Sequence, residues 1–160
     1  MFDDFPDEAL KSKAKLRIWD IFDGLEAAIA SDETYDVVVV FGILYYLMDH
    51  FRLFLLIRKL KPKLIIVDRE FMRRPASMMM LVSELTSNVL NAIPQYEGQV
   101  RAIKAIPSFK AMWRMAEALD YSCDWGDWNA RAEDDRRGVS GYYRETDMQR
   151  GTCVLRPIPR

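Results

Sequence analysis

The sequence is poor in the residues that most often mark metal or nucleotide sites. It has two cysteines, Cys123 and Cys153, and a single histidine, His50. The cysteines do not form a Cys-x-x-Cys pair, so these three residues predict no zinc site. None of the seven glycines stands two positions from another, so the chain has no Gly-x-Gly loop. A nicotinamide-dependent dehydrogenase is therefore disfavoured, because its dinucleotide fingerprint is absent.

A large net charge and a long hydrophobic run are also missing. The net charge is −1, so no overall positive field draws the chain to nucleic acid or to an anionic membrane. The apolar run at 37–47 ends at Asp49, well short of the roughly 18–20 residues of a membrane span. The first residues are acidic and lack the apolar centre of a signal peptide. We expect a soluble cytoplasmic protein with reduced thiols and with neither a metal nor a nucleic-acid or membrane partner.

What is present is enough apolar sequence for one domain over 1–160, with a βαβ unit as its clearest pattern. Val37–Phe41 is a β-branched run without polar alternation, which predicts a strand buried on both faces. Asp49 can cap a helix that reaches about Lys59, and Lys63–Asp68 follows as a second strand. We expect the two strands to be parallel, with their carboxyl ends at the edge where such sheets bind ligands.

Weaker patterns predict the other elements. We expect a short strand at 16–20, a helix at 24–31, a helix at 78–85, a helix from Ser108 to about Leu119, and strands at 120–125 and 150–156. No helix separates the last two strands, so they are predicted to pair antiparallel across a long polar loop.

The order of these elements, together with several short motifs, resembles the later part of class I S-adenosylmethionine-dependent methyltransferases. The motifs are Trp19-Asp20-Ile21-Phe22, Tyr35-Asp36-Val37-Val38, Phe41-Gly42-Ile43-Leu44-Tyr45-Tyr46, Leu60-Lys61-Pro62 and Leu64–Asp68. The resemblance implies an α/β fold with a partial Rossmann-like methyltransferase sheet. That sheet would be mainly parallel, with a C-terminal antiparallel strand pair and helices on both faces.

The same resemblance implies the site residues. They are Tyr46 as the catalytic residue; Asp20, Ile21, Phe41, Gly42 and Tyr45 around S-adenosylmethionine; and Asp68, Glu70, Tyr142 and Tyr143 around a small-molecule substrate. Each group has a structural alternative. Asp20 can instead be a helix N-cap, Tyr45 and Tyr46 can be core residues, and Asp68 and Glu70 can be solvated loop residues. His50 has a pKa suited to a base, but at a helix start we expect it on the exposed surface.

One part of the family pattern has no counterpart. The first strand, the Gly-x-Gly loop and the ribose-binding acid should precede residue 14, where the sequence has too few residues for them. That loop lets the backbone approach the cofactor. We therefore expect an N-terminally truncated methyltransferase domain. The alternative is a non-catalytic, methyltransferase-like remnant or interaction subunit that associates with itself or another chain through an exposed sheet edge.

Overall fold

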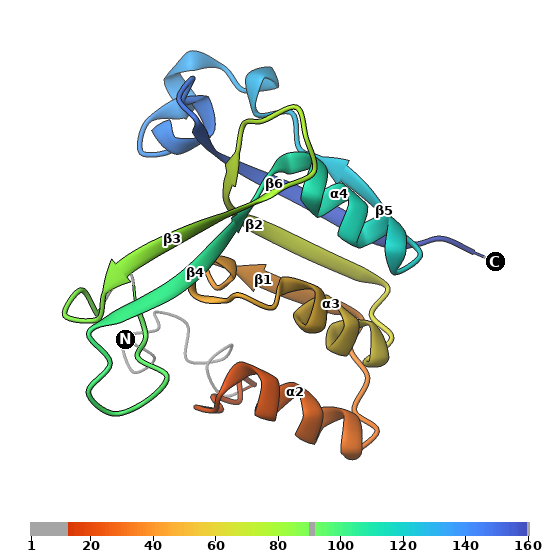
Figure 1. Cartoon of the computed structure of the whole chain (residues 1–160). Coiled ribbons are helices and arrows are strands. Elements are labelled where there is room, and N and C mark those ends of the chain that lie inside the picture. The colour runs from red at the N-terminus through yellow and green to blue at the C-terminus, as the bar shows by residue number, and fades with distance from the viewer. Residues whose placement is uncertain (1–12, 90–91, 160) are drawn as a thin grey trace.

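A four-stranded sheet with the order β1-β2-β6-β5 forms the centre of the fold (Figure 1). The computed structural model describes residues 13–89 and 92–159. The strands are β1 (Val37–Phe41), β2 (Leu64–Met72), β5 (Tyr121–Trp125) and β6 (Met148–Pro157). β1 and β2 are parallel, and the helix α3 (His50–Lys59) joins them, so the predicted βαβ unit is confirmed.

The sheet is mixed, and the prediction of a mainly parallel sheet is wrong, because most of its neighbouring strands run antiparallel. β6 lies antiparallel to β2 on one side and antiparallel to β5 on the other. Among the strand pairs of this sheet, only β1–β2 is parallel. The predicted α/β class and the antiparallel pairing of the last two strands are confirmed. The difference arises because β6 lies between β2 and β5, which makes two of the three strand pairings antiparallel.

The helices of the described part of the chain all lie on one face of this sheet. They are α2 (Ile21–Ala30), α3 and α4 (Phe109–Ala118); in Figure 1, α3 and α4 lie in front of the strands and α2 lies below α3. Side chains of α3 and α4 share one buried cluster with the strands, and α2 packs against that cluster through Ile21, Phe22 and Leu25. The expectation of helices on both faces is therefore wrong for residues 13–89 and 92–159. None of these helices has the length and apolarity needed to cross a membrane.

The uncovered face changes the environment of β1. Val40 points into the core and is 5% exposed, whereas Val37, Val39 and Phe41 are 48%, 50% and 61% exposed. The prediction that this strand is buried on both faces is wrong. The apolar run resembles that of a central strand, but no described element covers its second face.

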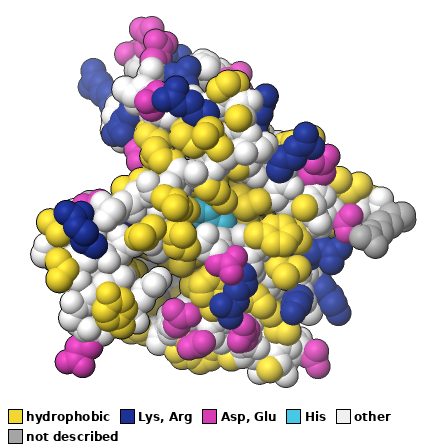
Figure 2. Space-filling model, in the orientation of Figure 1, with side chains coloured by type: hydrophobic (Ala, Val, Ile, Leu, Met, Phe, Trp, Pro, Cys, Tyr) yellow, Lys and Arg dark blue, Asp and Glu magenta, His cyan; other side chains and the backbone are white. Residues whose placement is uncertain are grey.

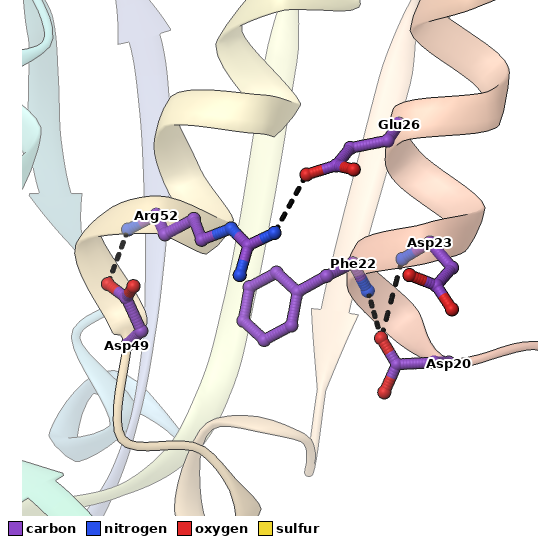
Figure 3. A network of polar contacts seen from close by, with 6 residues as sticks. All are labelled: Asp20, Phe22, Asp23, Glu26, Asp49 and Arg52. Carbon is purple, nitrogen blue, oxygen red and sulfur yellow. Dashed lines mark hydrogen bonds and ion pairs between the residues drawn. The ribbon is translucent and has the colours of Figure 1, made fainter.

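Side-chain caps set the start of each helix (Figure 3). Oδ1 of Asp20 accepts hydrogen bonds from the backbone N–H groups of Phe22 and Asp23, and Oδ1 of Asp49 accepts one from Arg52. Oγ of Ser108 caps α4 in the same way. Such caps satisfy N–H groups that have no partner within the helix. The caps predicted at Asp49 and Ser108 are confirmed, and α2 begins three residues before the predicted helix because Asp20 caps it.

A second, two-stranded sheet was not predicted. β3 (Met79–Leu85) pairs antiparallel with β4 (Arg101–Pro107), so the helix predicted at 78–85 is wrong. Exposure alternates along β3, as in a strand with two different faces. The strand predicted at 16–20 is also wrong: these residues form neither helix nor strand, and no neighbouring strand pairs with them.

Four short 3-10 helices complete the described chain. They are η1 (Leu44–Tyr46), η2 (Trp128–Ala130), η3 (Glu133–Arg136) and η4 (Ser140–Tyr143). The last three form the long connection between β5 and β6, and η1 follows directly after β1.

An aromatic cluster packs over the one glycine of β6. The rings of Phe71, Phe109 and Trp125 have centroids 4.6 to 5.2 Å apart. A Cβ atom on Gly151 would lie 2.8 Å from Cε1 of Phe109 and 3.1 Å from Cζ3 of Trp125. The missing side chain at Gly151 therefore lets these rings approach the sheet.

Candidate functional site

A cavity of about 640 Å³ opens beyond the carboxyl end of β1, beside the last residues of β2 and between η1, β4 and the loop that contains η4. It is lined by Gly42, Tyr45, Arg69, Glu70, Lys104, Ile106, Gly138, Val139, Ser140, Gly141, Tyr142, Arg144 and Arg150. Its volume is in the range of small-molecule sites. Four of the predicted site residues, Gly42, Tyr45, Glu70 and Tyr142, meet in this one cavity.

Gly42 forms the turn that ends β1. Its φ angle is +65°, a conformation that glycine adopts without steric cost, and nothing lies within 4 Å of the position where a Cβ would stand. Its N–H donates to the carbonyl of Asp68, 3.2 Å away. The turn therefore presents open backbone to the cavity.

Asp68 is a buried carboxylate with several partners. Its Oδ1 accepts from Nε of Arg150 at 2.6 Å, and its Oδ2 accepts from the hydroxyls of Tyr142 and Thr152. Asp68 lies inside β2 and is buried, so its alternative role as a solvated loop residue is wrong; it is also not among the cavity-lining residues. Burial and the hydrogen bond to Asp68 both raise the pKa of Tyr142. This network joins β2, β6 and η4 and holds Tyr142 at the cavity wall.

Glu70 also lies within β2, but its side chain reaches the cavity. Oε1 of Glu70 accepts from Nη1 of Arg144 at 2.7 Å. Tyr143 lies outside the lining, and its hydroxyl donates to the carbonyl of Trp128 at 2.8 Å. Trp128 in turn stacks on Tyr142 with ring centroids 3.7 Å apart. Tyr143 therefore supports the loop, while Tyr142 and Glu70 form the wall.

Tyr45 and Tyr46 are adjacent in η1 but are placed differently. Their hydroxyl oxygens lie 2.9 Å apart and share a hydrogen bond, and only Tyr45 lines the cavity. The hydrogen bond with Tyr45, with burial as a smaller cause, raises the pKa of Tyr46 to about 12. The hydroxyl of Tyr46 is thus protonated at neutral pH. Of the two tyrosines, Tyr45 is the one placed to contact a ligand in this cavity.

The remaining predicted cofactor residues lie elsewhere. Asp20 and Ile21 line a second hollow of about 370 Å³, where α2 and the preceding residues pack near the side chains of Val37 and Val39. Phe41 lines neither hollow. Asp20 is an N-cap, as its structural alternative predicted, and only its Oδ1 makes those cap bonds. The predicted cofactor residues are therefore divided between two hollows.

His50 is 1% exposed, so the expectation of an exposed helix-surface histidine is wrong. Only a small cyan area marks its side chain among apolar groups in Figure 2. Its Nε2 lies 2.6 Å from the carbonyl oxygen of Leu44, and its Nδ1 has no hydrogen-bond partner. Burial lowers the pKa of His50. The ring is therefore neutral, with the proton on Nε2 donated to Leu44.

Sequence reasoning missed the basic side chains of the cavity. Arg69, Lys104, Arg144 and Arg150 line it, and Arg69 and Lys104 are both buried. The one available signal was Arg69 itself, a charged residue placed between the apolar strand residues and Phe71. The other three lie in segments whose proximity to β2 depends on strand pairing.

The cysteines are both free thiols, on the neighbouring strands β5 and β6. A hydrogen bond with Cys123, together with burial, raises the pKa of Cys153. In residues 13–89 and 92–159, no three His, Cys, Asp or Glu side chains group closely enough to hold a metal ion.

Comparison with protein-family models, with curated proteins and with solved structures yields no match to this chain.

Proposed function

We propose that this chain is a methyltransferase domain that transfers a methyl group from S-adenosylmethionine to a small-molecule acceptor. The observation that carries the proposal is the 640 Å³ cavity beyond β1 and beside the last residues of β2, where Gly42, Tyr45, Glu70 and Tyr142 meet. All four are among the site residues that the sequence predicts. The co-directional pair β1–β2, its crossover helix and the closing antiparallel strands also support the proposal.

Two residues, which line different hollows, are each suited to one part of the cofactor. Gly42 offers open backbone after β1, and Oδ2 of Asp20 is not used by the helix cap and can accept from an amino group. Ile21, Phe41 and Tyr45 are the other residues that the resemblance assigns to the cofactor. No Gly-x-Gly loop is present for its methionine and ribose parts.

The cofactor supplies a methyl group that its sulfonium already activates. The protein then has to bind the acceptor and hold it in line, and a positioned base can assist. In the cavity, Glu70 and the hydroxyls of Tyr45 and Tyr142 are the polar groups suited to orient an acceptor. Tyr46, proposed from the resemblance as the catalytic residue, acts on the acceptor only through Tyr45 in this arrangement.

Calorimetry with S-adenosylhomocysteine tests the proposal. We expect one-to-one binding by the whole chain, and an Asp20→Asn variant that binds at least tenfold more weakly. Asparagine preserves the helix cap but replaces one carboxylate acceptor by a donor. Asp49→Asn makes the same change at the cap of α3 and should leave binding unchanged. Absence of binding by the unmodified chain would overturn the proposal.

A second function, that of an interaction subunit, is favoured by the edge position of β1. The carbonyl of Asp36 and the N–H of Gly42 point toward β2. By strand alternation, the peptide groups of Val37, Val39 and Phe41 therefore point to the open edge. Their apolar side chains are also exposed, which makes this edge suited to pairing with another strand. For this function, we expect the chain to dimerise and not to bind S-adenosylhomocysteine. Analytical sedimentation measures the dimerisation.

A further inference from the structure

The cavity contains one more positive charge than its ion pairs account for. Three of its four cations have a carboxylate partner: Arg150 pairs with Asp68, Arg144 with Glu70, and Lys104 with Glu84 at 3.5 Å. The fourth cation is Arg69. Within the described residues, no carboxylate forms an ion pair with it, and its Nε and Nη1 atoms have no hydrogen-bond partner.

Arg69 is also deeply buried, with 3% of its surface exposed. Its guanidinium carbon lies 5.2 Å from the ring centroid of Tyr45, and Nζ of Lys104 lies 5.4 Å from the same centroid. Burial lowers the pKa of Arg69 to about 10, which still leaves it charged at neutral pH. Glu70, which pairs with Arg144, offsets part of this charge without forming an ion pair with Arg69. A buried charge without an ion-pair partner is costly, and that cost falls when an anion occupies the adjoining cavity.

The lining indicates which kind of anion fits. One unpaired cation matches one negative charge, and the carboxylate of Glu70 in the same wall opposes a polyanion. Tyr45, Ile106, Val139 and Tyr142 add aromatic and apolar surface. A ligand with a single carboxylate on an apolar or aromatic body satisfies both conditions, because its charge meets Arg69 and its body meets these side chains.

We propose that this cavity binds a small monocarboxylic acid, with Arg69 as the counter-ion of its carboxylate. As a statement about the methyl acceptor, this rests on the proposed function: the acceptor is then a carboxylate-bearing molecule. As a statement about binding, it rests on the unpaired buried guanidinium alone.

Benzoate is a suitable probe, and benzamide is its neutral match. By calorimetry of the whole chain without S-adenosylmethionine, we expect benzoate to bind and benzamide to bind at least tenfold more weakly. Arg69→Met should abolish benzoate binding. Arg114→Met should not, because Arg114 pairs with Glu117 on the surface of α4, outside the cavity lining. Equal binding of the two probes, or unchanged benzoate affinity in Arg69→Met, would overturn the proposal, as would tighter binding of inorganic phosphate.

Amide NMR of the unmodified chain keeps the test decisive if Arg69→Met does not fold. Benzoate should shift the resonances of Gly42, Gly138 and Gly141, which line the cavity, and not that of Gly98. Shifts elsewhere and none at these three glycines would overturn the site. These measurements need no cofactor. If the chain binds S-adenosylhomocysteine but not benzoate, the carboxylate site is rejected and the proposed function is retained. If it binds benzoate but not S-adenosylhomocysteine, only methyl transfer is rejected.

Discussion

The carboxylate of Asp68 lies 2.6 Å from Nε of Arg150, which belongs to the strand that runs antiparallel beside its own. The pair joins the end of the parallel unit to the last strand of the chain. Asp68 is buried, whereas the side chain of Arg150 is half-exposed and also lines the cavity. The ion pair therefore links the buried carboxylate of Asp68 to Arg150 at the cavity wall.

Replacing Asp68 by asparagine should destabilise the fold markedly. The substitution keeps the shape but removes the charge that Arg150, Tyr142 and Thr152 share. Hydrogen bonds to charged groups contribute about 1.5–3 kcal/mol each, so we expect a loss of about 2–3 kcal/mol in the free energy of unfolding, measured in urea. Asp124→Asn is the matched control, because Asp124 and its partner Arg156 are both largely exposed. It should change stability by about 0.5 kcal/mol or less. Equal effects of the two substitutions would contradict this account.

Gly151→Ala should also destabilise the fold. The added methyl would lie 2.8 Å from Phe109 and displace the aromatic cluster, an overpacking that costs about 1–3 kcal/mol. Gly126→Ala serves for comparison. Its nearest contact would be an ordinary 3.5 Å to the carbonyl of Thr152, so we expect a change within about 0.5 kcal/mol. Thermal unfolding, monitored by tryptophan fluorescence, measures the stability of both variants. A Gly151→Ala protein as stable as the unmodified chain would show that the aromatic rings can shift at little cost.

His50 should make the protein less stable in mild acid. Burial lowers its folded-state pKa below the unfolded value of about 6.5, with Arg69 nearby as a further cause. The unfolded chain therefore binds a proton first as the pH falls, and stability is lost from about pH 6.5 downward. The chain has no other histidine, so this pH window reports on His50. We expect the free energy of unfolding to fall between pH 7 and pH 5.5 in the unmodified chain and to fall less in His50→Gln. Identical pH profiles would exclude His50 as the cause.

The exposed edge of β1 should determine any self-association. Val39→Lys places a charge on the bare sheet face, and charged side chains at sheet edges oppose pairing with other strands. If the chain dimerises through β1, this variant should sediment as a monomer at concentrations where the unmodified chain is a dimer. Leu81→Lys introduces the same charge at an exposed apolar position of β3 and should leave the dimer intact. Loss of the dimer in both variants would point to a general effect of charge.

Local signals explain which parts of the fold were predictable. The strand at 37–41, the helix capped by Asp49 and the helix capped by Ser108 each depend on a few consecutive residues, and the structure has all three. The hairpin β3–β4 depends on pairing between segments separated by fifteen residues. Its methionine-rich first strand suits either a helix or a strand, so the local pattern was insufficient.

The candidate site was predictable in part for a similar reason. Gly42, Tyr45 and Glu70 follow from the rule that ligands bind at the carboxyl ends of parallel strands. Arg69 could not be identified in this way, since its importance depends on burial and on which carboxylates are already paired. The placement of the helices on one face could not be predicted either, because an apolar strand has the same sequence pattern whether its second face is covered or open.

Gly151 places a constraint on how this sequence can change over time. A larger residue at that position becomes acceptable only when Phe109 or Trp125 is replaced by a smaller one. Among descendants of this chain, the three positions should therefore vary together, and a glycine retained at 151 should accompany large rings at 109 and 125.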